Sequence, residues 1–392
     1  MDFRAHRPRR GFGRSERSLA KIAEELTRFL TKAQRSLTSE TLHLSGRQRE
    51  TLASILVEFA EDVSQDIGIW KSLEAYNLDF FGTSLPCILP PDEAMDAAPV
   101  NPDRLQFLLW TLYSALEPDL ILAPTHQDLE RLAVWLADFL HERFAHLRYD
   151  SGVKSFLGTP NTYGWDVKKK LVWLGHHSYL FRLHCAQYIH DHGGTPDIPT
   201  LDDFICQETT SWSGLGVIDL LAATLDISDR QRRDLRSWYE RHRAYFRVVS
   251  LREPFMEVIN LLNEQPYTIH VGEISTPFRV QDVVVGSLVP WDGVWYWSGL
   301  QERYTNVTAE QIRHIQQEFP LQAPQIVYRY CEERAENARA IIRKHAQQFL
   351  DYHGTDLVLR TAIAAPVWRG GKCCFDKRYR SKNCIQISAE LY

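Results

Sequence analysis

The chain has 392 residues, of which 44% are apolar and 24% are charged, and its net charge is −5 at pH 7. These values are ordinary for a globular protein and exclude a disordered chain, a collagen and a coiled-coil rod. At roughly 100–200 residues per domain, the length predicts two or three domains. The net charge argues against a globally basic nucleic-acid binder, although both ends of the chain are locally basic.

Cysteine content and hydropathy favour a cytoplasmic protein. No apolar run is long enough to cross a bilayer, and no hydrophobic segment typical of a signal peptide follows the first residues. The seven cysteines are scattered, which is typical of reduced thiols rather than of a secreted disulfide framework. We therefore expect a cytoplasmic protein that has no membrane partner.

Apolar residues at helical spacing predict a helical body over residues 18–250, behind a flexible basic arm at 1–17. Ser45 and Gln48 form a capping-box pattern, so a helix is expected to begin directly after Ser45. Five prolines between 84 and 103 predict an extended loop. The expected helices cover about 18–36, 46–65, 70–76, 102–116, 125–147, 165–190, 215–225 and 228–246.

Between about 251 and 304 the pattern changes to short, β-rich segments. Strands are expected at 255–262, 267–271, 278–290 and 294–300, and Asp292-Gly293 is a strong hairpin signal. These segments predict a small antiparallel β module, either an SH3-like barrel or a sheet. The whole chain is therefore expected to be mainly α with one such module (α+β), followed by C-terminal helices at 305–354 and an irregular basic tail at 355–392.

Three of the eleven tryptophans lie within seven residues, around the predicted hairpin. Alternation along a strand places Trp295 and Trp297 on one face and Tyr296 on the other, with Trp291 before the turn. The simpler interpretation is that these rings pack the module and hold it against the helices. The functional interpretation is a binding surface, because aromatic clusters on small barrels bind peptides or stack on nucleic-acid bases.

The basic tail carries a second set of candidate binding residues. Its cations alternate with aromatic rings, a composition typical of contacts with nucleic acids or acidic partners. A solvated, disordered tail explains the same composition. The candidate residues are Arg369, Lys372, Lys377, Arg378 and Arg380.

One catalytic alternative rests on a resemblance. The helical architecture and the Arg–His pair of Arg236 and His242 resemble the HEPN ribonucleases, which carry such a pair four to six residues apart. That resemblance implies that the arginine holds a phosphate while the histidine assists proton transfer. Arg339 and His345 have the same spacing, and solvated helix faces are the favoured explanation of both pairs.

Metal and cofactor chemistry has weaker support. His190 and His192 could offer two imidazoles to a metal hydrolase, but the chain contains no HExxH motif. Three cysteines of the tail, at 373, 374 and 384, contain no CxxC pair, so free thiols are the favoured interpretation. Neither a P-loop nor a GxGxxG motif after a strand is present. No metal or cofactor is expected.

The leading hypothesis is a non-enzymatic, cytoplasmic binding or scaffold protein. It would contact a protein or a nucleic acid through the aromatic β module and the basic termini. The HEPN-like ribonuclease is the alternative, and a histidine-ligated metal hydrolase is less favoured. The oligomeric state and the identity of the partner stay open.

Overall fold

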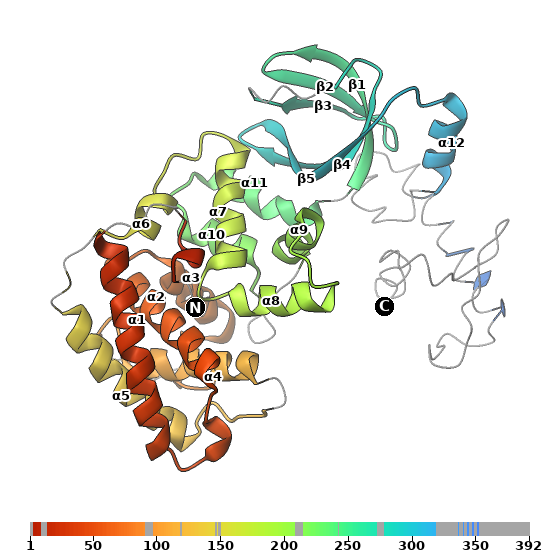
Figure 1. Ribbon diagram of the computed structural model, residues 1–392. Helices are drawn as coiled ribbons and strands as arrows, with labels where there is room; N and C mark the ends of the chain where they lie inside the picture. Colours follow the sequence, from red (N-terminus) through yellow and green to blue (C-terminus); the bar gives the residue numbers. More distant parts are fainter. Residues whose placement is uncertain are drawn as a thin grey trace. The chain divides into compact units, whose positions relative to one another are not determined.

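The computed structural model describes residues 3–8, 14–90, 97–117, 120–145, 147, 150–207, 215–241, 243–272 and 278–318, with a few isolated residues between 336 and 352 (Figure 1). The chain divides into two compact units. The helical unit consists of Met1–Tyr239 together with Val289–Gly293, and the barrel unit consists of Glu240–Leu288 together with Val294–Tyr392.

The helical unit begins with a 3₁₀ turn at Phe3–His6 and continues through helices that follow one another in the sequence (Figure 1). They are α1 (Arg14–Ala33), α2 (Gly46–Gln65), α3 (Ile69–Phe81), α4 (Pro102–Leu116), α5 (Gln127–Phe144), α6 (Gly152–Leu157), α7 (Gly164–His177), α8 (Arg182–Asp191), α9 (Ile198–Gln207), α10 (Val217–Thr224) and α11 (Asp229–Arg236).

Helix α2 is the central helix of this unit. Ser45 and Gln48 form the expected capping box, which satisfies backbone donors at the first turn. Every residue from Thr51 to Asp62 is buried, so all faces of the helix contact protein here. Phe59 packs edge-on against Trp70, with ring centroids 4.7 Å apart. A helix buried all round normally carries apolar residues alone, which makes the acidic residues of α2 unusual.

The predicted helix over 165–190 is wrong, because the structure divides it into α7 and α8. Ser178 is extended, with φ −65° and ψ 153°, and ends α7. The next three residues, Tyr179, Leu180 and Phe181, are buried, so tertiary packing prevails over helical periodicity. His177 and His184 therefore lie on different helices rather than on one shared face.

The predicted helix over 228–246 also ends early. Its capping box at Ser228 and Gln231 is confirmed, but α11 ends at Arg236 and a 3₁₀ turn covers Ser237–Glu240. The first strand then begins at residue 243, ahead of the expected start of the β module. Alternate burial along this strand favours extended backbone over a helix.

The barrel unit contains a closed five-stranded barrel with the strand order β1-β2-β3-β5-β4 (Figure 1). Pairing is antiparallel for β1 with β2, β1 with β4 and β2 with β3, whereas β3 and β5 are parallel. The predicted fold class, a mainly helical chain with a small β module, is confirmed. The strands are β1 (Arg243–Arg252), β2 (Phe255–Asn260), β3 (Pro266–His270), β4 (Val283–Trp291) and β5 (Val294–Tyr304).

Alternate residues of each strand fill the barrel interior. The fully buried part of this core is Ala244, Phe246, Val248, Met256, Val258, Leu262, Ile269, Val271 and Val284. Helix α12 (Ala309–Glu318) lies beside the barrel, where Ile315 packs against the core and Gln316 donates a hydrogen bond to the Leu261 carbonyl. The opposite faces of the strands point away from this core.

The turn of the β4–β5 hairpin belongs to the helical unit. Asp292 and Gly293 have φ of 51° and 84°, as the predicted Asp-Gly turn requires. Trp291 is fully buried and its indole N–H donates to the Asn161 carbonyl at 2.9 Å. The indole of Trp238 in turn donates to the Pro290 carbonyl at 2.8 Å. Among the described residues, no helix is both long and apolar enough to span a membrane.

Candidate functional site

The aromatic residues predicted from the sequence do not form one exposed cluster. Trp291 is buried in the helical unit, and Tyr296 is only 4% exposed. Trp295 and Trp297 are half-buried and pack on the barrel core. Trp295 lies edge-on to Tyr267, at 4.9 Å between ring centroids. Most of this aromatic surface is therefore in contact with protein.

A different set of side chains lies on the outer face of the barrel. Arg252 on β1 pairs with Phe255 on β2, and Phe255 pairs with His270 on β3. Directly paired residues share a face, so the three side chains form a row across three adjacent strands, which we call the barrel row. The next residue of β2, Met256, points into the core.

The barrel row combines a cation with an exposed ring. The side chain of Phe255 is 38% exposed, and its ring lies edge-on to His270 at 5.2 Å. His270 stacks on Tyr296 of β5 at 5.7 Å, and its Nδ1 accepts from the Gly272 amide. Partial burial lowers the pKa of His270, so the imidazole is neutral at neutral pH. Tyr296, one of the residues predicted from the sequence, thus contacts this row.

Neither catalytic alternative is supported by the arrangement of side chains among the described residues. Arg236 lies at the end of α11, where its Nε is 3.9 Å from a carboxylate oxygen of Asp219. His242 lies outside the described residues, as do the basic tail and its cysteines. His192 is stacked on Tyr188, with ring centroids 3.9 Å apart. Within the part of the chain that the structure describes, no group of three or more potential ligands is placed to hold a metal ion.

The helical unit contains a buried ionic network that includes its N-terminal segment, residues 3–8. Arg7 makes two hydrogen bonds to Glu61, at 2.7 and 2.8 Å, and its Nε is 2.6 Å from Glu16. Ser151 donates to Glu61 at 2.7 Å. Burial alone would lower the pKa of Arg7, but these two carboxylates raise it. Part of the expected flexible arm is thus anchored in the folded unit, where Phe3 is also buried.

A second buried ion pair joins α2 to α8. Arg182 donates to Glu58 at 2.5 Å and to Ser54 at 3.3 Å. Burial raises the pKa of Glu58, against the opposing effect of Arg182. Buried ion pairs of this kind are costly to desolvate and are weak evidence for a stabilising role. Their concentration on α2 therefore marks the region as a candidate site.

Asp62, the third buried acid of α2, connects that helix to α3. Its carboxylate accepts from the amides of Gly68, Ile69 and Trp70 at the start of α3, and from the Tyr179 hydroxyl at 2.7 Å. Burial raises the pKa of Asp62 to about 6, and these hydrogen bonds partly oppose the rise. This carboxylate acts as a cap of α3, which is a structural role.

Two histidines lie close to this network. The rings of His6 and His177 are 6.3 Å apart between centroids. Burial lowers the pKa of His6 to about 3, and the positive charges of Arg182, His177 and His176 add to the effect. Burial and the same kind of neighbours lower the pKa of His177 to about 4. Both imidazoles are therefore neutral at physiological pH.

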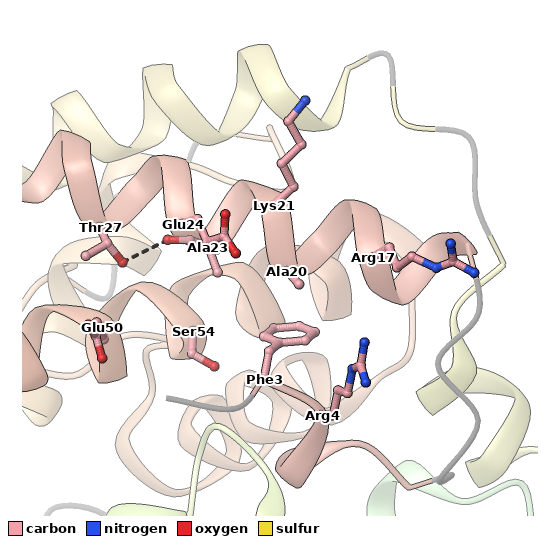
Figure 2. A pocket seen from close by; sticks show the side chains of 10 residues that line it. All are labelled: Phe3, Arg4, Arg17, Ala20, Lys21, Ala23, Glu24, Thr27, Glu50 and Ser54. Carbon is pink, nitrogen blue, oxygen red and sulfur yellow. Dashed lines mark hydrogen bonds between the residues drawn. The ribbon is translucent and has the colours of Figure 1, made fainter.

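A pocket of about 660 Å³ opens beside the N-terminal segment (Figure 2). Its walls come from the 3₁₀ turn, from α1 and from α2. Ser54, which lines the pocket, also accepts from Arg182, so the pocket adjoins the buried network. The sequence analysis did not identify this region. The acids of α2 are its visible signal in the sequence, because Glu58, Glu61 and Asp62 lie in a largely apolar stretch.

The fold defines a class of protein: a mainly helical chain that carries a small closed β-barrel. Residues 18–207 match a family described as a protein of unknown function, DUF3843. The matched residues lie within the helical unit, from α1 to α9, and end before the barrel. No curated protein and no solved structure matches the chain.

Proposed function

We propose that the protein is a binding protein whose barrel row contacts a single-stranded nucleic acid. The observation that carries the proposal is the direct adjacency of Arg252, Phe255 and His270 on three neighbouring strands. Proteins that bind single strands combine cations for the phosphates with rings on which bases stack. The barrel row offers both on one face.

Each residue of the row has a distinct role in this proposal. Phe255 provides the stacking platform, because its ring is exposed and is held edge-on by His270. Arg252 provides the charge for a phosphate, one strand away from the ring. His270 is neutral and orients Phe255 rather than pairing with a phosphate.

The strand order supports the same assignment. A five-stranded barrel with the order β1-β2-β3-β5-β4 and a parallel β3–β5 pair has the topology of the OB-fold, whose β2–β3 face binds oligonucleotides in many proteins. Phe255 and His270 lie on these two strands. Topology alone does not define a function, so the proposal depends on the side chains of the row.

The experiment measures binding of fluorescein-labelled oligo(dT) and oligo(U) to the full-length protein by fluorescence anisotropy. We expect Phe255→Ala to weaken binding by about tenfold or more, because a base–aromatic stack contributes about 1–3 kcal/mol. Arg252→Glu should weaken binding and reduce its salt dependence. The matched controls are Leu300→Ala, an exposed apolar residue of β5, and Arg313→Glu on α12.

The proposal fails if neither oligonucleotide binds, or if the controls weaken binding as much as the two row variants. Cleavage of the RNA that is lost in His242→Ala would instead favour the HEPN-like ribonuclease. If truncation after residue 354 abolishes binding while Phe255→Ala has no effect, the basic tail rather than the barrel is the contact.

A further inference from the structure

A second row of side chains lies beside the barrel row, on the same three strands. Ser250 on β1 pairs with Glu257 on β2, and Glu257 pairs with Thr268 on β3. Each of these residues is two positions along its strand from a member of the barrel row, so both rows lie on the same face of the sheet. Glu257 and Thr268 are exposed, and Ser250 is half-buried.

The carboxylate of Glu257 is held by its neighbour across the strands. The Ser250 hydroxyl donates to Oε2 of Glu257 at 2.8 Å. A carboxylate has about four acceptor positions on its two oxygens, so both oxygens can still accept further hydrogen bonds. The second row contains an acid and two hydroxyls, whereas the barrel row contains the cation Arg252. Because a carboxylate repels a phosphate, the second row suits the edge of a base rather than the nucleic-acid backbone.

The spacing of the two rows matches the size of a base. A strand advances about 3.3 Å per residue, so neighbouring side chains on one face are about 7 Å apart along β2. A base that stacks on Phe255 is larger than the phenyl ring and extends beyond it toward the next side chain on that face, Glu257. Its phosphate can then lie against Arg252, which is directly opposite Phe255 on β1.

The four kinds of base differ in what they offer to a carboxylate. The Watson–Crick edge of guanine carries two adjacent donors, the N1–H and the N2 amino group, which match the two oxygens of a carboxylate. Adenine and cytosine each present one amino group beside a ring nitrogen that accepts, and thymine and uracil present one N–H between two carbonyls. A carboxylate therefore makes two charge-assisted hydrogen bonds with guanine alone, and it faces an acceptor on every other base.

We propose that Glu257 gives the barrel row a preference for guanine. This inference rests on the proposed function of the row. The guanine stacks on Phe255 and donates its N1–H and N2–H to the Glu257 carboxylate. Ser250 is a positioning residue, because it holds the carboxylate without contacting the base.

The test measures binding of the full-length protein to short labelled strands by fluorescence anisotropy. One strand is oligo(dT), and in the others the central thymine is replaced by guanine, hypoxanthine, adenine or cytosine. A single guanine per strand avoids quadruplex formation. The guanine strand should bind about tenfold more tightly than oligo(dT), as expected for a bidentate contact. Hypoxanthine lacks the N2 amino group, so its strand should lose most of this gain.

Glu257→Gln keeps the size of the side chain but leaves a single acceptor oxygen. It should abolish the preference for guanine without weakening the binding of oligo(dT). Ser250→Ala should reduce the preference by a smaller factor, again without weakening the binding of oligo(dT). Glu310→Gln, at an exposed position of α12, is the matched control and should keep the preference.

The guanine inference is overturned, and the barrel row stands, if Phe255→Ala weakens the binding of every strand but the guanine strand binds no more tightly than oligo(dT). It is also overturned if the adenine or cytosine strand binds as tightly as the guanine strand, or if Glu257→Gln keeps the preference. If no strand binds, the proposed function of the barrel row is wrong and the guanine inference fails with it.

Discussion

At the scale of single residues, the buried guanidinium of Arg7 leads to a clear stability prediction. Arg7→Ala leaves Glu16 and Glu61 buried without their cation. Removing one partner of a buried pair typically costs about 3–5 kcal/mol, since the remaining charge stays desolvated. We expect a loss of this size in the free energy of unfolding, measured by urea denaturation with tryptophan fluorescence.

The control for this prediction is Arg35→Ala, which removes the same kind of side chain from an exposed position. Surface substitutions of this type usually change stability by no more than about 0.5 kcal/mol. Equal effects of the two variants would mean that the Arg7 network contributes little to the fold.

The neutral histidines next to the network make the helical unit sensitive to acid. His6 and His177 have pKa values of about 3 and 4 when folded, against roughly 6.5 when unfolded. From pH 6.5 down to about 4, the unfolded chain therefore binds protons that the folded chain does not, so stability falls as the pH falls. The raised pKa values of Asp62, about 6, and of Glu58 act in the opposite direction.

We expect the melting temperature to fall between pH 7 and pH 5, and to fall less steeply in His177→Gln. The comparison concerns the slope with pH, so a uniform loss of stability in the variant does not affect it. His141→Gln, at an exposed position of α5, should keep the original slope. Identical slopes in all three proteins would contradict the assignment of the acid sensitivity to His177.

At the scale of elements, local sequence signals predicted much of the fold. The capping boxes at Ser45 and Ser228 and the Asp292-Gly293 turn all formed as expected, because each depends only on neighbouring residues. The helix over 165–190 was wrong because residues 179–181 are buried by contacts that are distant in sequence. The parallel β3–β5 pair was likewise invisible, since alternation gives no information about which strands pair.

The candidate sites were harder to predict for the same reason. Trp295 and Trp297 stand out by composition, yet the structure packs both on the barrel core. Phe255 and His270 are fifteen residues apart, and only the register of β2 and β3 makes them neighbours. The pocket joins Arg4 to Arg17 through the docking of Arg7 on Glu61, another contact between distant residues. Strand pairing and the burial of side chains, rather than residue type alone, define the barrel row and the pocket.

At the scale of the whole molecule, the hairpin between β4 and β5 supplies a core residue, Trp291, to the helical unit. Trp291→Ala should destabilise the helical unit by roughly 3–5 kcal/mol, since it empties a fully buried position and removes the hydrogen bond to Asn161. Hydrogen–deuterium exchange resolved by peptide should then show faster exchange around residues 152–177 and 229–239. The control is Trp297→Ala, which should accelerate exchange in the strands instead. The same exchange pattern in both variants would contradict this division.

This sharing of residues also sets an order of events during synthesis. Trp238 leaves the ribosome before Pro290 and Trp291, which contribute to the same unit. At about 5–20 residues per second, the interval is on the order of seconds. During that time the helical bundle has an unfilled position and an indole N–H without its final acceptor. The nascent bundle is therefore expected to be a better chaperone substrate than the finished protein, and it reaches its final packing only after the hairpin has been translated.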